Sequence, residues 1–274
     1  MRLHYVQAGD GPLVILLHGF PEFWYSWRHQ IQALAAAGLR VVAPDMRGYN
    51  LSSRPHPVAA YRSDRLAADV RELIHERGAH SARLAGHDWG AAVAWVTAMN
   101  HPDAVQRLAI LNLPHIRRLM RGLLDPRQLA RSWYMLFFQL PWLPERMAPT
   151  ANWAALRRGL RRDPCPGAFT EQDIERYVEA WAQPGAARAM INYYRAAFRQ
   201  APWRAQSRIR PIAAPTLVIF GERDRYLRHQ LAEPYPCDVP NLQRVVRLPE
   251  ASHWVQNDQP GRVNELLIDF FGSA

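Results

Sequence analysis

Short apolar runs alternate with helical segments along most of the chain. The apolar runs end in turn residues and are expected to be buried strands, at residues 13–17, 39–44, 82–85, 108–111, 216–220 and 244–248. Helices are expected between them and after the last strand, at residues 64–76, 90–99 and 264–271. The alternation predicts an α/β fold in which a mostly parallel sheet is covered by helices.

The pattern changes between about residues 114 and 211. Strand-like runs disappear, aromatic residues, Met, Arg and Pro become dense, and helices are expected at 132–140, 171–181 and 186–198. We interpret 115–210 as a helical cap (lid) over a core made of 1–114 and 211–274. The cap is expected to lie over the carboxyl edge of the sheet, where open α/β sheets bind ligands. Most of its aromatic side chains, such as Trp133, Phe137, Trp153 and Trp181, are expected in the core or lining a pocket.

Composition and charge exclude several classes of protein. The 274 residues carry a net charge of +10, and all 34 basic residues are arginine. The arginines are scattered and no nucleic-acid-binding motif accompanies them, so no nucleic-acid partner is expected. No apolar run reaches 18 residues, so no membrane partner is expected. The first ten residues lack the apolar run of a signal peptide, which favours a cytoplasmic location. The two cysteines, Cys165 and Cys237, are too few for a disulfide scaffold and too far apart for a metal motif.

The segment Gly86-His87-Asp88-Trp89-Gly90 lies between an expected strand and an expected helix. This is the context of a nucleophile elbow, a sharp turn flanked by glycines that usually presents a serine. Here the central residue is Asp88, whose carboxylate is ionised at neutral pH and can attack carbon directly to form an ester. The same segment is also compatible with Asp88 acting only as the N-cap of the following helix.

Further residues at strand ends favour the catalytic interpretation. The backbone N–H groups of Phe20 and Trp89 are candidates for an oxyanion hole. Asp224 and His253 follow later strands, in the order nucleophile, acid, histidine that is typical of α/β-hydrolases. His253 would activate the water that clears an ester, and Asp224 would orient its ring. Glu222 is a second candidate for the acid.

Several motifs together resemble the soluble epoxide hydrolases of the α/β-hydrolase superfamily, over nearly the whole chain. They are His18-Gly19-Phe20-Pro21, Asp45-Met46-Arg47-Gly48, Gly86-His87-Asp88-Trp89-Gly90-Ala91, Asn112-Leu113-Pro114-His115 and Ser252-His253-Trp254. The resemblance implies an α/β-hydrolase core with an inserted cap, and hydrolysis of an epoxide to a vicinal diol without a metal or organic cofactor. The short segment before residue 13 differs from that pattern, and one edge strand of the core is expected to be absent.

The resemblance also implies two cap tyrosines that donate to the epoxide oxygen. Tyr134 and Tyr194 lie at the matching positions, and Tyr193 is a rival for the second. Phenol hydroxyls can protonate the alkoxide formed when the ring opens. The substrate is expected to be a small apolar or aryl epoxide, which reacts with water in a pocket that includes Phe20, Trp89 and Phe138.

Two other functions remain open at this point. A haloalkane dehalogenase would use the same Asp88 nucleophile, but the tyrosines favour an epoxide, because halide release needs no proton. A non-catalytic binding protein could use the same fold, although the full set of candidate catalytic residues argues against it. A homodimer is compatible with the sequence, which does not fix the oligomeric state.

Overall fold

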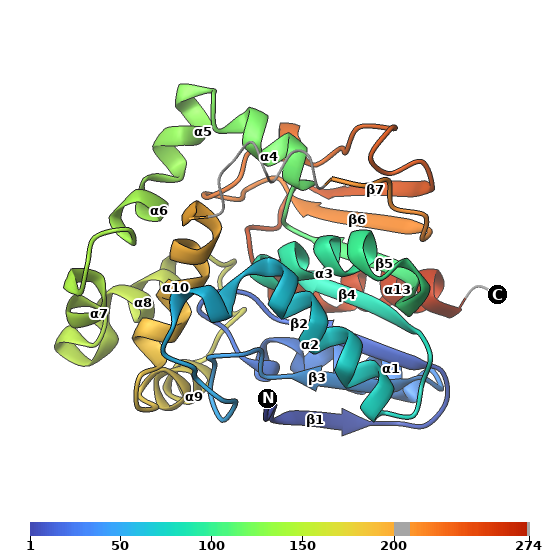
Figure 1. Ribbon diagram of the computed structural model, residues 1–274, viewed down its shortest axis with the longest axis horizontal. Helices are drawn as coiled ribbons and strands as arrows, with labels where there is room; N and C mark the ends of the chain where they lie inside the picture. Colours follow the sequence, from blue (N-terminus) through green and yellow to red (C-terminus); the bar gives the residue numbers. More distant parts are fainter. Residues whose placement is uncertain (200–208, 273–274) are drawn as a thin grey trace.

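The computed structural model describes residues 1–199 and 209–272. Within this part of the chain, seven strands form one sheet in the order β1-β3-β2-β4-β5-β6-β7 (Figure 1). The strands are β1 (Tyr5–Ala8), β2 (Leu13–Leu17), β3 (Arg40–Pro44), β4 (Ala82–His87), β5 (Val105–Leu111), β6 (Thr216–Gly221) and β7 (Leu242–Leu248). The six expected strands are therefore present, and pairing between them is parallel throughout.

Strand β1 was not predicted from the sequence. It has only four residues, and it pairs antiparallel with β3, with Tyr5 opposite Pro44 and Ala8 opposite Val41. A short edge strand buries little apolar surface, so it lacks the continuous apolar run that marks the central strands. The sheet is therefore mostly parallel with one antiparallel edge.

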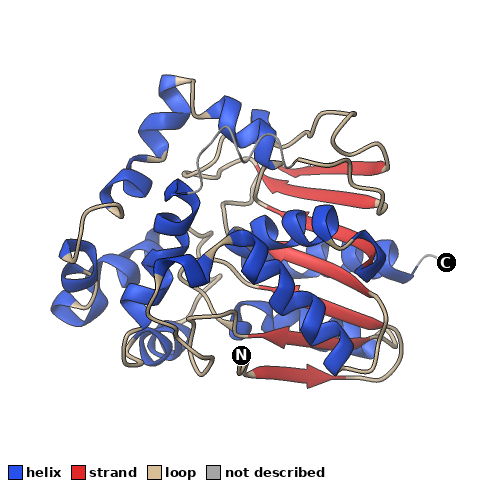
Figure 2. Cartoon of the chain, in the orientation of Figure 1, coloured by secondary structure: helices blue, strands red, loops and turns tan. Residues whose placement is uncertain are grey.

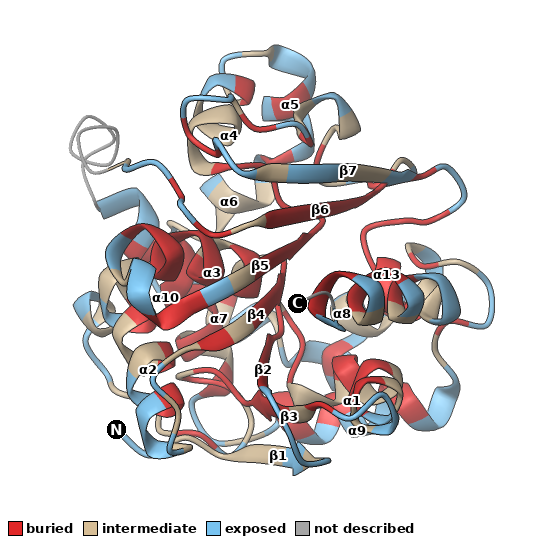
Figure 3. Ribbon diagram, turned by 90° about the vertical axis from the view of Figure 1, so that its right-hand side faces the viewer, coloured by how far each residue is buried: buried red, intermediate tan, exposed pale blue. Residues whose placement is uncertain are grey.

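Helices cover both faces of the sheet, and the central strands are largely buried between them, whereas the edge strands β1 and β7 are partly exposed (Figures 1 and 3). Outside the segment between β5 and β6, the helices are α1 (Arg28–Ala36), α2 (Ser63–Glu76), α3 (Trp89–Asn100), α12 (Val255–Asp258) and α13 (Pro260–Gly272). Short 3-10 helices lie at η1 (Trp24–Trp27), η2 (Val58–Tyr61), η3 (Pro102–Ala104) and η4 (His229–Leu231). Alternate strand residues belong to two apolar clusters, with Ile15 in one and Leu16 in the other, because successive side chains point to opposite faces.

The chain between β5 and β6 contains helices and no strand within its described residues (Figure 2). These helices are α4 (Ile116–Gly122), α5 (Pro126–Arg131), α6 (Trp133–Phe137), α7 (Leu143–Met147), α8 (Thr150–Arg162), α9 (Glu171–Trp181) and α10 (Ala186–Arg199). The expected helices at 171–181 and 186–198 agree closely with α9 and α10. The helix expected at 132–140 is shorter, and residues 200–208 of the expected cap lie outside the described residues.

One expectation about the inserted helices is wrong. Trp153 and Trp181 are buried, but the side chain of Trp133 is 63% exposed. Tyr134 and Phe138 occupy the inward face of α6 and pack against the main apolar cluster. Because successive side chains on a helix point about 100° apart, Trp133 lies on the outer face of α6 when its neighbour Tyr134 faces inward.

Candidate active site

Asp88 lies on a strained turn between β4 and α3. Its backbone has φ 49° and ψ −119°, a conformation that costs free energy for a residue other than glycine. The flanking glycines make the turn possible: a Cβ on Gly90 would lie 2.1 Å from the Leu17 carbonyl oxygen, and one on Gly86 would lie 2.4 Å from that of Gly90. The Asp88 side chain makes no capping hydrogen bond to α3, so it is not a simple N-cap.

The carboxylate of Asp88 is held from the loop after β2. The Phe20 backbone N–H donates to Asp88 Oδ1 at 2.8 Å, which is one of the two contacts expected for an oxyanion hole. Burial opposes ionisation of Asp88, but the hydrogen bond and charge of His253, together with the Phe20 N–H, more than offset it and lower the pKa of the carboxyl. Asp88 is therefore an anion at neutral pH. The role expected for the Trp89 N–H stays a prediction.

His253 lies between two carboxylates. Its Nδ1 is 2.7 Å from Asp224 Oδ2, and its Nε2 is 3.6 Å from Asp88 Oδ2. Burial by itself disfavours the imidazolium, but Asp224 and then Asp88 outweigh it and raise the pKa of His253 well above its usual value. Glu222, the second candidate for the acid, faces His229 instead, with Oε1 3.6 Å from Nδ1. The structure therefore brings Asp88, Asp224 and His253 together.

Asn112 anchors the acid, a role that the sequence did not reveal. Its side-chain amide donates to Asp224 Oδ2 at 2.8 Å, and its Oδ1 accepts from the Gly221 N–H at 3.0 Å. The other oxygen of Asp224 accepts from the N–H groups of Tyr226 and Leu227, at 2.7 and 2.9 Å. With donors on both oxygens, the carboxylate is fixed in the orientation that meets His253. The position of Asn112 directly after a strand was the available signal.

A buried histidine joins the elbow to two other loops. His87 Nδ1 is 2.7 Å from Glu22 Oε2, and His87 Nε2 is 2.8 Å from the backbone oxygen of His253. The same Glu22 oxygen accepts from the Gly19 N–H at 2.9 Å. The loop that carries Phe20, the elbow and the histidine loop are thus tied to one another. Sequence reasoning assigned no role to Glu22 or His87.

The two expected tyrosines meet above the elbow. The rings of Tyr134, on α6, and Tyr194, on α10, have centroids 5.8 Å apart. Burial, followed by the charge of Asp88, raises the pKa of Tyr134 well above its usual value, and burial, Tyr134 and Asp88 do the same for Tyr194. Both phenols therefore keep their protons. The rival, Tyr193, donates its hydroxyl to the Arg47 carbonyl oxygen at 2.7 Å, so the geometry favours Tyr194.

Aromatic rings surround Tyr194. Its ring centroid lies 5.3 Å from that of Phe20, 5.1 Å from Trp89 and 4.9 Å from Phe138. These are the three residues expected to line a substrate pocket. Tyr226, which sequence reasoning missed, packs its ring 5.2 Å from that of His253. The surroundings of the carboxylate and imidazole are thus apolar and suited to an apolar molecule.

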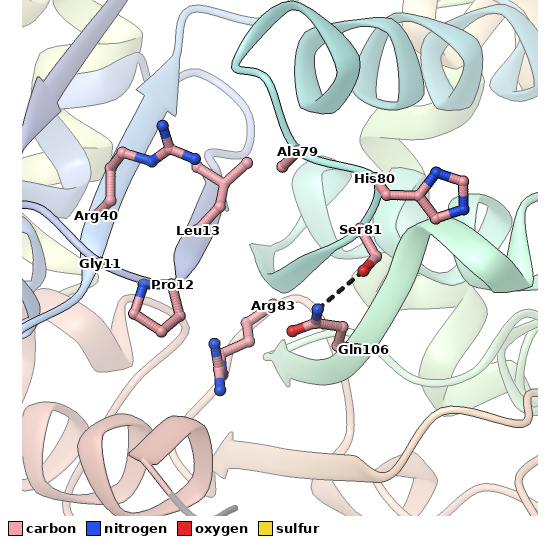
Figure 4. Close-up of a pocket in the computed structure, with 9 residues that line it drawn as sticks. All are labelled: Gly11, Pro12, Leu13, Arg40, Ala79, His80, Ser81, Arg83 and Gln106. Atoms are coloured by element: carbon pink, nitrogen blue, oxygen red, sulfur yellow. Dashed lines mark hydrogen bonds between the residues drawn. The ribbon is translucent and has the colours of Figure 1, made fainter.

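A separate hollow of about 500 Å³ lies at the opposite edge of the sheet (Figure 4). Leu13, Arg40, Arg83 and Gln106 line it, and they are at or near the amino ends of their strands. Asp88, Asp224 and His253 instead follow the carboxyl ends of β4, β6 and β7, which are strands of six to seven residues. The hollow is therefore not part of this site. Within the described residues 1–199 and 209–272, no three His, Cys, Asp or Glu side chains gather so as to hold a metal ion.

Comparisons with known proteins agree with this fold. The family described as "alpha/beta hydrolase fold" matches residues 12–260. The chain therefore belongs to the α/β-hydrolase family, and its relatives place it with the members of the epoxide hydrolase type.

Two similar proteins and two similar structures illustrate the relationship. The chain is 40% identical to the AB hydrolase superfamily protein YfhM of Bacillus subtilis, over 98% of this chain and 94% of that protein. It is 39% identical to human epoxide hydrolase 4, over 98% of this chain and 75% of that protein.

A crystal structure of an epoxide hydrolase from Bacillus megaterium with an inhibitor is 34% identical, with a TM-score of 0.89 over 99% of this chain and 97% of that one. Epoxide hydrolase A from Mycobacterium thermoresistibile is 33% identical, with a TM-score of 0.86 over 99% of this chain and 95% of that one.

Proposed function

We propose that this protein hydrolyses an epoxide to a vicinal diol through a covalent ester on Asp88. The observation that carries the proposal is the position of the Asp88 carboxylate, between His253 Nε2 at 3.6 Å and the paired tyrosines Tyr134 and Tyr194. An ionised carboxylate, a histidine supported by an acid and two protonated phenols are the groups that two-step epoxide opening needs.

In the first step, Asp88 attacks a ring carbon and the carbon–oxygen bond of the epoxide breaks. Oδ2 is the better placed nucleophile, because Oδ1 is held by the Phe20 N–H. The electron pair of the broken bond stays on the epoxide oxygen, which takes a proton from Tyr134 or Tyr194. Their raised pKa values keep that proton available at neutral pH.

In the second step, water attacks the ester carbonyl after losing a proton to His253 Nε2. The Phe20 N–H, with the Trp89 N–H as the proposed second donor, stabilises the negative oxygen of the tetrahedral intermediate. The bond between the acyl carbon and the substrate oxygen then breaks, and that oxygen takes the proton from His253. Asp224 stabilises the imidazolium that forms between these transfers. Asp88 is left as a carboxylic acid and releases its proton to solvent, and the tyrosine that protonated the epoxide oxygen regains a proton from solvent, which restores the free site.

Forming the ester changes the charge next to His253. Asp88 and Asp224 both raise the pKa of His253 in the free protein. An ester has no charge, so alkylation removes the contribution of Asp88 and lowers the pKa of His253. A larger fraction of His253 is then the neutral imidazole that can accept a proton. The base is thus favoured at the stage of the reaction that needs it.

We propose the cap at residues 115–210 and the core at 1–114 and 211–274, with a small apolar or aryl epoxide and water as reactants. A cytoplasmic location and a metal-free reaction stay predictions. No helix among the described residues combines the length and hydropathy of a membrane span. Dehalogenation with the same Asp88 remains the second candidate, because an Asp ester and activated water would serve both reactions.

The test combines trapping with a substrate panel. We expect Asp88→Asn to abolish turnover of aryl epoxides, and His253→Gln to accumulate an ester that mass spectrometry locates on Asp88. Asp224→Asn should slow ester hydrolysis, whereas Glu222→Gln, a matched loss of one carboxylate, should leave turnover near wild type. An adduct on any other residue would refute the mechanism, and turnover of haloalkanes but not epoxides would favour the second candidate.

A further inference from the structure

Exposed hydrophobic side chains are concentrated in one part of the molecule. Eleven large hydrophobic residues are exposed within the described residues, and eight of them lie between positions 124 and 147. The eight are Leu124, Leu129, Trp133, Leu136, Leu140, Trp142, Leu143 and Met147. We call this group the α5–α7 surface. Two of its members are tryptophans that are each 63% exposed, and clustered exposure of this kind marks an interaction site.

The surface has the geometry of an amphipathic helix face. Leu129, Trp133, Leu136 and Leu140 recur at intervals of four, three and four residues, which places them on one side of a helical path. Tyr134 and Phe138 lie on the other side and pack inward. Figure 1 shows α5, α6 and α7 following one another along the outer edge of the molecule, away from the sheet. Within residues 1–199 and 209–272, these outward side chains are exposed.

The charged side chains of the α5–α7 surface are either basic or already in ion pairs. Residues 124–147 contain three arginines, Arg127, Arg131 and Arg146, and two acidic residues. The two acids, Asp125 and Glu145, form ion pairs with Arg228 and Arg195, which lie outside this segment. Arg146 is exposed, and its guanidinium lies 5.4 Å from the centroid of the Trp142 ring. Aromatic and cationic groups therefore share this surface.

We propose that the α5–α7 surface docks on a lipid bilayer that contains anionic headgroups. Tryptophan rings favour the boundary between headgroups and acyl chains, leucine side chains partition below it, and arginines bind lipid phosphates. The charge selects this occupant over a second copy of the chain, because a self-dimer through this surface would bring the exposed Arg127 and Arg146 of two copies together, while the acids of the surface are already in ion pairs. The sequence expectation of no membrane partner considered only membrane-spanning segments, and docking needs none.

Docking would place the cap at the lipid bilayer, in which apolar molecules dissolve. Trp133 on the outer face of α6 is adjacent in sequence to Tyr134 on its inner face. The helix that contacts the lipid is therefore the helix that carries one of the tyrosines over Asp88. The docking does not rest on the proposed reaction, since vesicle binding is measured without a substrate.

Vesicle flotation of the purified protein tests the proposal. The vesicles contain phosphatidylcholine alone or phosphatidylcholine mixed equally with phosphatidylglycerol. We expect binding only to the anionic vesicles, with loss of binding at high salt. Arg127→Gln with Arg146→Gln should lower the partition coefficient by about tenfold to thirtyfold, since each basic residue at an anionic surface contributes about 1 kcal/mol. Arg244→Gln with Arg262→Gln removes the same charge from β7 and α13 and should have a much smaller effect.

A second pair of variants tests the apolar part of the surface. Trp133→Ser with Trp142→Ser should lower binding by at least tenfold, whereas Leu51→Ser with Phe198→Ser, exposed residues outside the surface, should not. Circular dichroism checks that each variant folds. If the tryptophan variants do not fold, the arginine variants still test the proposal. The proposal is overturned by absence of binding, by equal binding to both vesicles or by equal loss in the controls. It is also overturned if the tryptophan changes abolish a dimer while vesicles bind no protein.

Discussion

Replacing Asn112 with alanine tests how firmly the acid of the site is held. The Asn112 side chain is fully buried and its backbone has φ 44°, in the left-handed region that asparagine tolerates better than alanine. The substitution removes the donor to Asp224 Oδ2 and leaves the buried Gly221 N–H without its acceptor. It therefore perturbs both the Asp224 carboxylate, which must contact His253, and the end of strand β6 at Gly221.

The magnitude follows from the separate contributions. The left-handed backbone costs alanine about 1–2 kcal/mol. An orphaned buried N–H costs about 1–3 kcal/mol, and a lost hydrogen bond to a charged group about 1.5–3 kcal/mol. Asn152→Ala is a matched control, since Asn152 has φ 55° but is exposed. Only the backbone contribution applies there, so Asn112→Ala should destabilise the protein by about 2.5–6 kcal/mol more than Asn152→Ala.

Urea unfolding of the two variants measures this difference. Turnover of an epoxide by folded Asn112→Ala should also fall, because Asp224 loses a contact on the oxygen that faces His253. Asn112→Gly removes the backbone strain and should recover only that part of the stability. A difference below about 1 kcal/mol between the two alanine variants would refute the reasoning, because it is smaller than either lost interaction.

Two further predictions concern the tyrosines and His253. Tyr134→Phe and Tyr194→Phe should each slow ring opening by about 10- to 100-fold, with less effect on ester hydrolysis, while Tyr193→Phe should affect neither step as strongly. Stopped-flow traces separate the two steps, and equal slowing of both would count against proton donation. Because the pKa of His253 is raised in the folded state, its contribution to stability is complete below its unfolded value of about 6.5 and is lost as pH rises through the folded value. The wild type should therefore melt at a higher temperature than His253→Gln, and the difference should shrink from pH 6 to pH 9. A difference that grows over that range would contradict a raised pKa of His253.

The central strands and the elbow were predictable because their signals are local. Strands β2 and β6 are continuous apolar runs, and the order strand, Asp88, helix can be recognised from neighbouring residues alone. Asp224 and His253 could be placed near Asp88 because the carboxyl ends of parallel strands share one edge of a sheet. Each of these inferences needs only position relative to a strand end.

Other features depend on contacts between distant parts of the chain. The link between Glu22 and His87 joins residues 65 positions apart, and Asn112 meets Asp224 across 112 positions. No local pattern marks such partners. Trp133 was expected in the interior because it is aromatic, but burial is decided by which face of α6 meets the core, and that face holds Tyr134. The choice between Tyr193 and Tyr194 likewise needed the contact with Arg47.

The two tyrosines and the other candidate catalytic groups come from different parts of the fold. Tyr134 and Tyr194 lie on the inserted helices, whereas Asp88, Asp224 and His253 follow strands of the sheet. In the proposed reaction, the insertion thus serves bond opening in the electrophile, and the sheet serves clearance of the ester. Natural selection can then alter the two steps separately. Changes in the inserted helices can adapt the protein to a new electrophile while Asp88, Asp224 and His253 stay unchanged.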